Sequence, residues 1–194
     1  FWRDAPLDDQ VTYLIGRMSD EELLGQLLVI GYLGTGFPEE LRDWITKRHL
    51  GGVKIFSRNV AELPELAGAV ADMQAAARAA RLQIPLLIIT DQEGGWVRHI
   101  KGSTSETPGN LGLGAAGVPY DAYRTGLFIG QELRALGINM NLGRPQLGVS
   151  FSKRENVSHV TVLGVWGTAL LCIAVHCFAW FYFALDCFAL LCFA

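Results

Sequence analysis

Short hydrophobic runs alternate with helical patterns along most of the chain. Runs of strand length cover residues 27–32, 53–56, 86–90 and 138–142, and helical spacing or composition covers residues 11–18, 39–48, 62–81 and 119–136. Strands that alternate with helices form a parallel sheet joined by right-handed crossovers. Four such units make half of a (β/α)8 barrel or most of a small open sheet. We therefore predict an α/β fold that holds about the first four βα units of a partial TIM barrel.

Local signals place the ends of several of these elements. Ser19, followed three residues later by Glu22, predicts a capping box at the start of a further short helix. Pro38 and the two acidic residues after it suit the first turn of the next helix, and Gly137 suits a C-cap. Residues 91–118 show no comparable pattern, and we expect them to form a long loop.

The chain changes character towards its C-terminal end. Residues 160–194 are almost purely apolar and hold all four cysteines. We therefore expect two parts, a partial barrel in residues 1–146 and an unrelated apolar, helical tail in residues 147–194. The tail exceeds the roughly 20 apolar residues that span a bilayer, although His176 and Asp186 interrupt it. Three interpretations stay open: a membrane anchor, an out-of-frame terminus without selected structure, and a buried element that covers an open barrel edge.

Composition and charge narrow the function classes. The formal net charge is −3 and no basic stripe is present, which argues against a nucleic-acid partner. The cysteines lack CxxC spacing, so we expect no zinc site, and nothing in the chain calls for another metal or an organic cofactor. The chain starts at Phe1 without a secretory signal, which leaves the compartment open. We expect a cytoplasmic body, with membrane association only through residues 160–194.

The candidate chemistry lies in the segment LLIITDQEGGWVRHIKG, residues 86–102. Asp91 directly follows the hydrophobic run, and ligands of α/β sheets and barrels bind at the carboxyl ends of the strands. A carboxylate there can accept hydrogen bonds from two neighbouring hydroxyl groups of a sugar. We therefore predict that Asp91 binds substrate rather than capping a helix. Gly94 and Gly95 allow positive φ and a close backbone approach, although a tight turn alone would also explain them.

Four further side chains of this segment are candidates for the same site. Glu93 orients Arg98 or caps the loop, and the rigid guanidinium of Arg98 offers donors to hydroxyl groups or a carboxylate. Trp96 stacks on a sugar face or packs in the core. His99 has no identifiable carboxylate partner, so a structural role is expected for it.

Two other motifs carry weaker signals. In the segment GVKIFSRNV, the polar residues Ser57, Arg58 and Asn59 follow a strand. Either they reach the pocket or Asn59 caps the next helix, and we expect the cap. Residues 112–117 match GxGxxG, but no strand precedes them and no acidic residue ends a strand about 20 residues later. We therefore predict no dinucleotide site.

Five segments of the chain occur in the order typical of one enzyme family: MSDEELLGQLLVIGY, GGVKIFSRNV, IPLLIITDQEGGWVRHIKG, TPGNLGLGA and ELRALGINMNL. Over about residues 7–142 the chain resembles the N-terminal domain of glycoside hydrolase family 3, especially its bacterial β-N-acetylhexosaminidase branch. The resemblance implies a (β/α)8 barrel that removes terminal, non-reducing β-linked sugars with retention, through a glycosyl-enzyme on an aspartate. In this branch the acid/base is a histidine paired with an aspartate on a mobile loop.

The resemblance assigns roles to only a few residues of this chain. Asp91 matches the aspartate that holds hydroxyl groups of the sugar, and Arg98 matches an arginine that lines or supports that pocket. Trp96 stands where an arginine is common. The later arginine motif, the lysine–histidine segment and the nucleophile have no counterpart, and Asp186 does not match the nucleophile's setting.

We therefore expect no catalytic residue in this chain, and a truncated glycosidase that is inactive alone. The alternatives are a non-catalytic sugar-binding or membrane-tethered remnant and a β-glucosidase-type specificity.

Overall fold

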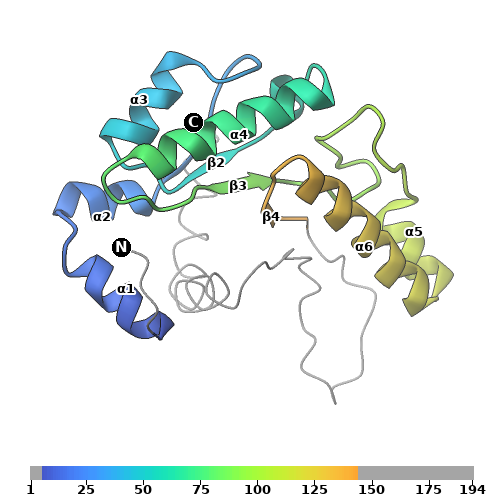
Figure 1. Ribbon diagram of the computed structural model, residues 1–194. Coiled ribbons are helices and arrows are strands. Elements are labelled where there is room, and N and C mark those ends of the chain that lie inside the picture. The colour runs from blue at the N-terminus through green and yellow to red at the C-terminus, as the bar shows by residue number, and fades with distance from the viewer. Residues whose placement is uncertain (1–5, 144–194) are drawn as a thin grey trace, which may run out of the picture. The chain divides into compact units, whose positions relative to one another are not determined.

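The computed structural model describes residues 6–143 (Figure 1). Contacts divide the chain into two units, and α1 (Leu7–Ile15) belongs to the unit that does not contain the sheet. Asp8 and Asp9 lie in the first turn of α1, where negative charge stabilises a helix N-terminus. Compared with the helix predicted over residues 11–18, α1 begins four residues earlier and ends three residues earlier.

The second unit is an α/β structure whose described part begins at Arg17. Its elements are α2 (Asp20–Gln26), β1 (Val29–Gly31), α3 (Glu39–Lys47), β2 (Gly52–Lys54), the 3-10 turn η1 (Ser57–Asn59), α4 (Leu63–Ala79), β3 (Leu87–Thr90), α5 (Gly109–Ala116), α6 (Pro119–Ala135) and β4 (Met140–Asn141). The four strands are parallel and lie in the order β1-β2-β3-β4. Each crossover thus leads to the neighbouring strand, as in the wall of a (β/α)8 barrel, which confirms the predicted fold class.

Hydrophobic residues of the two central strands form the centre of the core. Val53 on β2 pairs in register with Ile88 on β3, and both are fully buried. Leu66 and Met73 on α4 and Leu133 on α6 are buried in the same cluster. A strand buried on both faces reads as an unbroken hydrophobic run, which is why β3 is visible in the sequence.

One predicted loop contains a helix. Residues 91–118 were expected to lack regular structure, but α5 occupies Gly109–Ala116. Its glycines weaken the helical pattern, because glycine has low helix propensity and contributes no side chain to an apolar face. The helix ends at Gly117, which has a φ of +66° and terminates it in the left-handed conformation. The GxGxxG match therefore lies on a helix and its C-cap.

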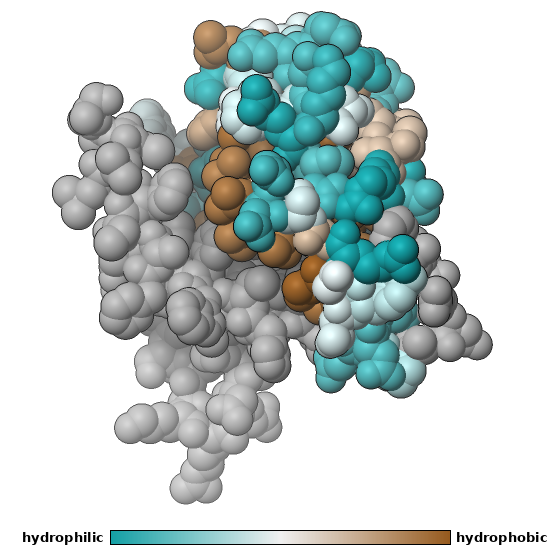
Figure 2. All heavy atoms as spheres, turned by 90° about the vertical axis from the view of Figure 1, so that its left-hand side faces the viewer, coloured by the Kyte–Doolittle hydropathy of each residue, from teal (hydrophilic) through white to brown (hydrophobic). Residues whose placement is uncertain are grey.

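Some large hydrophobic side chains of the described part reach the surface. Figure 2 shows hydrophobic residues gathered on one face between hydrophilic ones. Leu24 and Leu27, at and just after α2, are each more than half exposed. No described helix is long and apolar enough to cross a membrane. The boundary predicted after residue 146 and the apolar segment 160–194, with its cysteines and its suggested membrane role, lie outside the described residues.

Candidate functional site

Asp91 lies at the carboxyl end of β3, paired with a lysine from β2. Lys54 is the last residue of β2 and is the register partner of Ile89. Asp91 follows Ile89 by two residues, so the alternation of a strand places Lys54 and Asp91 on the same face of the sheet. The Lys54 Nζ lies 2.9 Å from Oδ2 of Asp91, and both side chains are about three-quarters buried. Sequence reasoning missed Lys54 because it lies inside a hydrophobic run.

His99 also faces Asp91, so the expectation that this histidine has no carboxylate partner is wrong. Its Nε2 lies 3.6 Å from Oδ2 of Asp91. Its Nδ1 lies 3.0 Å from Oγ of Ser57 in η1, and the ring of Phe56 meets the imidazole edge to face at 5.4 Å. The loop after β3 carries His99 back to the end of β2, and that return cannot be read from sequence spacing. We call Asp91, Lys54, His99, Ser57 and Phe56 the Asp91 cluster.

The two glycines after Asp91 are required by the path of the loop. Gly94 has a φ of +87°, and a Cβ on it would overlap Oγ1 of Thr107. A Cβ on Gly95 would lie 2.7 Å from the Cα of Gly109, so two backbone segments touch there. Both properties that the sequence suggested, positive φ and close approach, are confirmed. They bring the loop after β3 against the segment that leads into α5.

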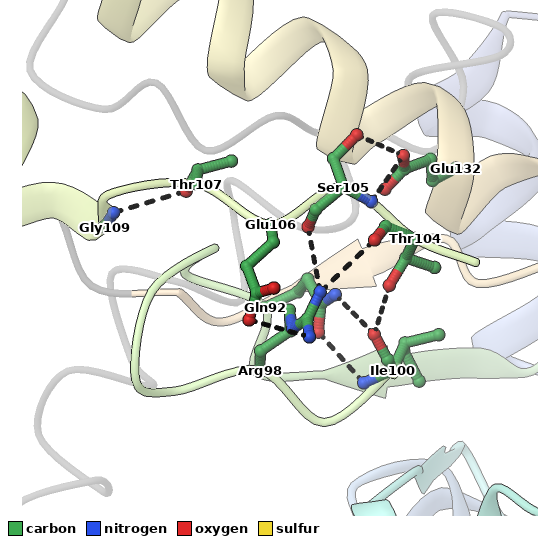
Figure 3. A network of polar contacts seen from close by, with 9 residues as sticks. All are labelled: Gln92, Arg98, Ile100, Thr104, Ser105, Glu106, Thr107, Gly109 and Glu132. Carbon is green, nitrogen blue, oxygen red and sulfur yellow. Dashed lines mark hydrogen bonds and ion pairs between the residues drawn. The ribbon is translucent and has the colours of Figure 1, made fainter. Parts of the chain in front are cut away.

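Arg98 binds the protein's own loop (Figure 3). Its Nη1 donates to the carbonyl oxygens of Thr104 and Ser105 at 3.2 and 3.3 Å, and its Nη2 pairs with Oε1 of Glu106 at 3.2 Å. Ser105 in turn donates from its amide and its hydroxyl to Oε1 of Glu132 on α6, at 2.8 and 2.5 Å. In this arrangement the guanidinium holds residues 104–106 in place beneath α6 rather than presenting a fork to solvent.

Gln92 fixes the start of the same loop, a role that its polar side chain does not reveal in the sequence. The side chain is buried and makes two hydrogen bonds to the backbone of Ile100, donating to its oxygen and accepting from its nitrogen (Figure 3). Asn141 on β4 binds the Gln92 amide and carbonyl at 2.9 Å each. A buried side-chain amide satisfied in this way rigidifies its surroundings. The position of Asp91 is therefore set by neighbours from β2, β4 and its own loop.

The structure also places three other polar or aromatic residues singled out in the sequence, Trp96, Glu93 and Asn59. Trp96 is fully exposed, which overturns the alternative of core packing. The Glu93 amide donates to the carbonyl of Val97 at 2.9 Å within the turn. The prediction that Asn59 caps α4 is wrong. Its side-chain amide donates to the carbonyls of Tyr32 and Gly34, and its Oδ1 accepts from the amide of Phe56. The side chain is buried because it joins the loops after β1 and β2.

The chemistry available at this edge is hydrogen bonding by one carboxylate flanked by cationic and ring-bearing groups. Among residues 6–143 no group of three or more histidine, cysteine, aspartate and glutamate side chains could hold a metal ion. A carboxylate at such an edge can accept hydrogen bonds from hydroxyl groups, and charge-assisted hydrogen bonds are about twice as strong as neutral ones. The fold and this cluster are those of a barrel-type protein in which polar side chains gather at the carboxyl ends of the strands, the edge where barrels bind their ligands.

The chain belongs to the family defined by the glycosyl hydrolase family 3 N-terminal domain, whose model matches residues 19–159. It is 37% identical over 147 residues to beta-hexosaminidase A of Pseudoalteromonas piscicida, covering 68% of this chain and 24% of that protein. It is 30% identical over 161 residues to a beta-N-acetylglucosaminidase/beta-glucosidase of Cellulomonas fimi, covering 81% of this chain and 26% of that protein.

A solved structure of similar sequence has the same fold over the matched part. It is a glycoside hydrolase family 3 beta-N-acetylglucosaminidase from Paenibacillus sp. str. FPU-7, 42% identical, with a TM-score of 0.61. The match covers 64% of this chain and 23% of that one. The chain therefore spans about a quarter of the length of these relatives.

Proposed function

We propose that this chain supplies the sugar-binding wall of a β-N-acetylhexosaminidase site, in which Asp91 accepts hydrogen bonds from hydroxyl groups of a terminal, β-linked N-acetylhexosamine. The observation that carries the proposal is the carboxylate at the carboxyl end of β3, whose contacts with Lys54 and His99 are both closest at Oδ2. Within the described part of the chain no hydrogen bond reaches Oδ1, and we assign this oxygen to the ligand. The names of the relatives support a β-linked N-acetylhexosamine as substrate.

The proposed sugar-binding wall has three further members, Arg98, Glu93 and Trp96, each with its own role. The Arg98 guanidinium supports the wall from behind through Thr104, Ser105 and Glu106. The exposed indole of Trp96 offers a flat apolar surface of the kind that stacks on a sugar ring. Glu93 shapes the turn between Asp91 and Trp96 through its backbone.

Replacing Asp91 with asparagine tests the binding role. Because a hydrogen bond to a charged group contributes about 1.5–3 kcal/mol, we expect the Kd for N-acetyl-D-glucosamine to rise by about tenfold or more. The measurement is a ligand-detected NMR titration of the full 194-residue chain. Asp43→Asn, a surface carboxylate on α3, is the control and should bind like the parent. Equal affinity of the Asp91 variant and the parent would refute the proposal, and a titration with glucose separates the β-glucosidase-type alternative.

For this chain we expect binding without turnover. Retaining hydrolysis needs two catalytic groups, about 5 Å apart in the usual carboxylate form, and no residue of this sequence matches the family's nucleophile or acid/base. The measurement is release of the chromophore from a chromogenic N-acetylglucosaminide over many hours. Turnover that disappears in Asp91→Ala would contradict this expectation, whereas turnover that persists in that variant would indicate a contaminating enzyme.

A further inference from the structure

The contacts of the Asp91 cluster are arranged unevenly around the carboxylate. Lys54 and His99 both approach Oδ2, at 2.9 and 3.6 Å, one from the end of β2 and the other from the loop after β3. These contacts restrain the plane of the carboxylate, because any rotation about its last bond other than the half-turn that exchanges its equivalent oxygens lengthens both of them. A side chain held by its neighbours loses less conformational freedom when a ligand binds, and affinity rises accordingly.

From this geometry we propose that Lys54 and His99 are positioning residues, which fix Asp91 through Oδ2 so that Oδ1 faces the sugar hydroxyl groups. The inference rests on the proposed function, since it concerns how the same carboxylate is presented. It assigns a role to two residues through Asp91 rather than through contact with the sugar.

The surroundings of both residues show that they are themselves held in place. Oγ of Ser57 lies 3.0 Å from Nδ1 of His99, so a donated hydroxyl proton leaves Nε2–H directed at Asp91. The ammonium of Lys54 lies 5.2 Å from the centre of the Phe56 ring, a distance at which a cation is attracted to the ring face. Phe56 also packs edge to face on His99, so one aromatic ring supports both positioning groups.

Burial of the three side chains makes these contacts effective. Lys54, Asp91 and His99 expose 25%, 23% and 26% of their side chains, respectively. Ion pairs on a fully exposed surface contribute little, because water screens them and mobile side chains lose entropy when they pair. Partial burial reduces the screening, while the remaining exposure leaves room for a ligand to reach Oδ1.

The test compares sugar affinities of variants of the full chain. Lys54→Met keeps the length of the side chain and removes its charge, and we expect the Kd for N-acetyl-D-glucosamine to rise by about fivefold. His99→Leu should raise the Kd by about twofold to threefold, because its contact with Asp91 is longer. Lys54→Arg should restore most of the affinity, and Lys47→Met, an exposed position on α3, should change nothing.

A second readout distinguishes positioning from a general loss of structure. In the ligand-free protein, the 13C resonance of the Asp91 carboxyl group should move in Lys54→Met and in His99→Leu, while that of Asp43 stays in place. Circular dichroism establishes that each variant is folded, and His99→Leu serves as the independent variant should Lys54→Met fail to fold.

The possible outcomes separate the two proposals. A parent chain that binds no sugar overturns the proposed function and this inference with it. A parent that binds, is weakened by Asp91→Asn and is unaffected by both Lys54→Met and His99→Leu overturns this inference alone. This inference is also overturned if Lys54→Arg binds the sugar as weakly as Lys54→Met does, because the positive charge would then not be what holds Asp91.

Discussion

Replacing Gly25 with alanine is expected to destabilise the described α/β unit by about 3 kcal/mol or more, the cost typical of severe overpacking against rigid structure. A Cβ at this position of α2 would overlap the carbonyl oxygen of Arg48 and lie 2.8 Å from that of His49. These are backbone atoms, so no side-chain rotation relieves the clash. The carbonyl of Gly25 also accepts a hydrogen bond from the Gly51 amide at 2.9 Å, which would be strained as the segments separate.

The measurement is thermal unfolding followed by circular dichroism, where a loss of this size lowers Tm by about 10 °C. Gly68→Ala is the matched control. Gly68 lies within α4, and a Cβ on it would meet no atom within 4 Å. Alanine there should stabilise by up to about 1 kcal/mol, because glycine is the poorer helix former. A Gly25→Ala protein that melts at or above the parent's Tm would show that α2 does not pack on the turn before β2 in this way.

The fold was predictable where one residue type or one run determines the local structure. The β-branched, apolar segment that became β3 is almost wholly buried, and such a strand needs no knowledge of its neighbours to be recognised. The capping box of Ser19 and Glu22 is local as well, and the structure confirms both of its hydrogen bonds. The α5 helix was not predictable, because GNLGLGAA has neither a polar face nor strong helix formers at its start.

In the candidate site, too, the residues fixed by local sequence were predictable and those fixed by distant contacts were not. Asp91 was identified because a carboxylate at the end of a parallel strand has a place in the fold that sequence order alone gives. Its partner Lys54 depends on the register between β2 and β3, and His99 depends on the return of a loop. Arg98 was predicted to offer its donors to a ligand, whereas the structure directs them at three residues of a stretch without recognisable pattern. Long-range pairing is what a single sequence does not contain.

Glu22 has both kinds of contact: its role in the capping box was predictable from the sequence, and its ion pair with a distant residue was not. Its Oε2 accepts from the Ser19 amide at 2.9 Å within the capping box. The same carboxylate forms a two-point ion pair with Arg81, 59 residues away, and Nε2 of His49 lies 3.4 Å from Oε1. The Glu22 side chain is nearly fully buried. The start of α2, the turn after α3 and the segment after α4 are therefore joined through one carboxylate.

This environment makes stability depend on acid pH. The hydrogen bonds from Arg81, followed by that from the Ser19 amide, lower the pKa of Glu22 from its ordinary value of 4.5 to about 2, against the opposing effect of burial. A carboxyl group with a lowered pKa in the folded state contributes stability that is fully present above pH 4.5. That contribution is lost as the pH falls from about 4.5 to about 2, because the unfolded chain takes up the proton first.

Glu22→Gln is expected to lower the free energy of unfolding by about 2 kcal/mol at pH 7, because the half-exposed Arg81 loses a charged, hydrogen-bonded partner. Urea unfolding of parent and variant at several pH values measures this difference, which should shrink below pH 4.5 and nearly vanish at pH 2. The control is Asp43→Asn, which removes an exposed ion pair with Lys47 and should cost less than about 0.5 kcal/mol. A difference between parent and Glu22→Gln that stays constant from pH 7 to pH 2 would mean that the Glu22 charge does not stabilise the fold.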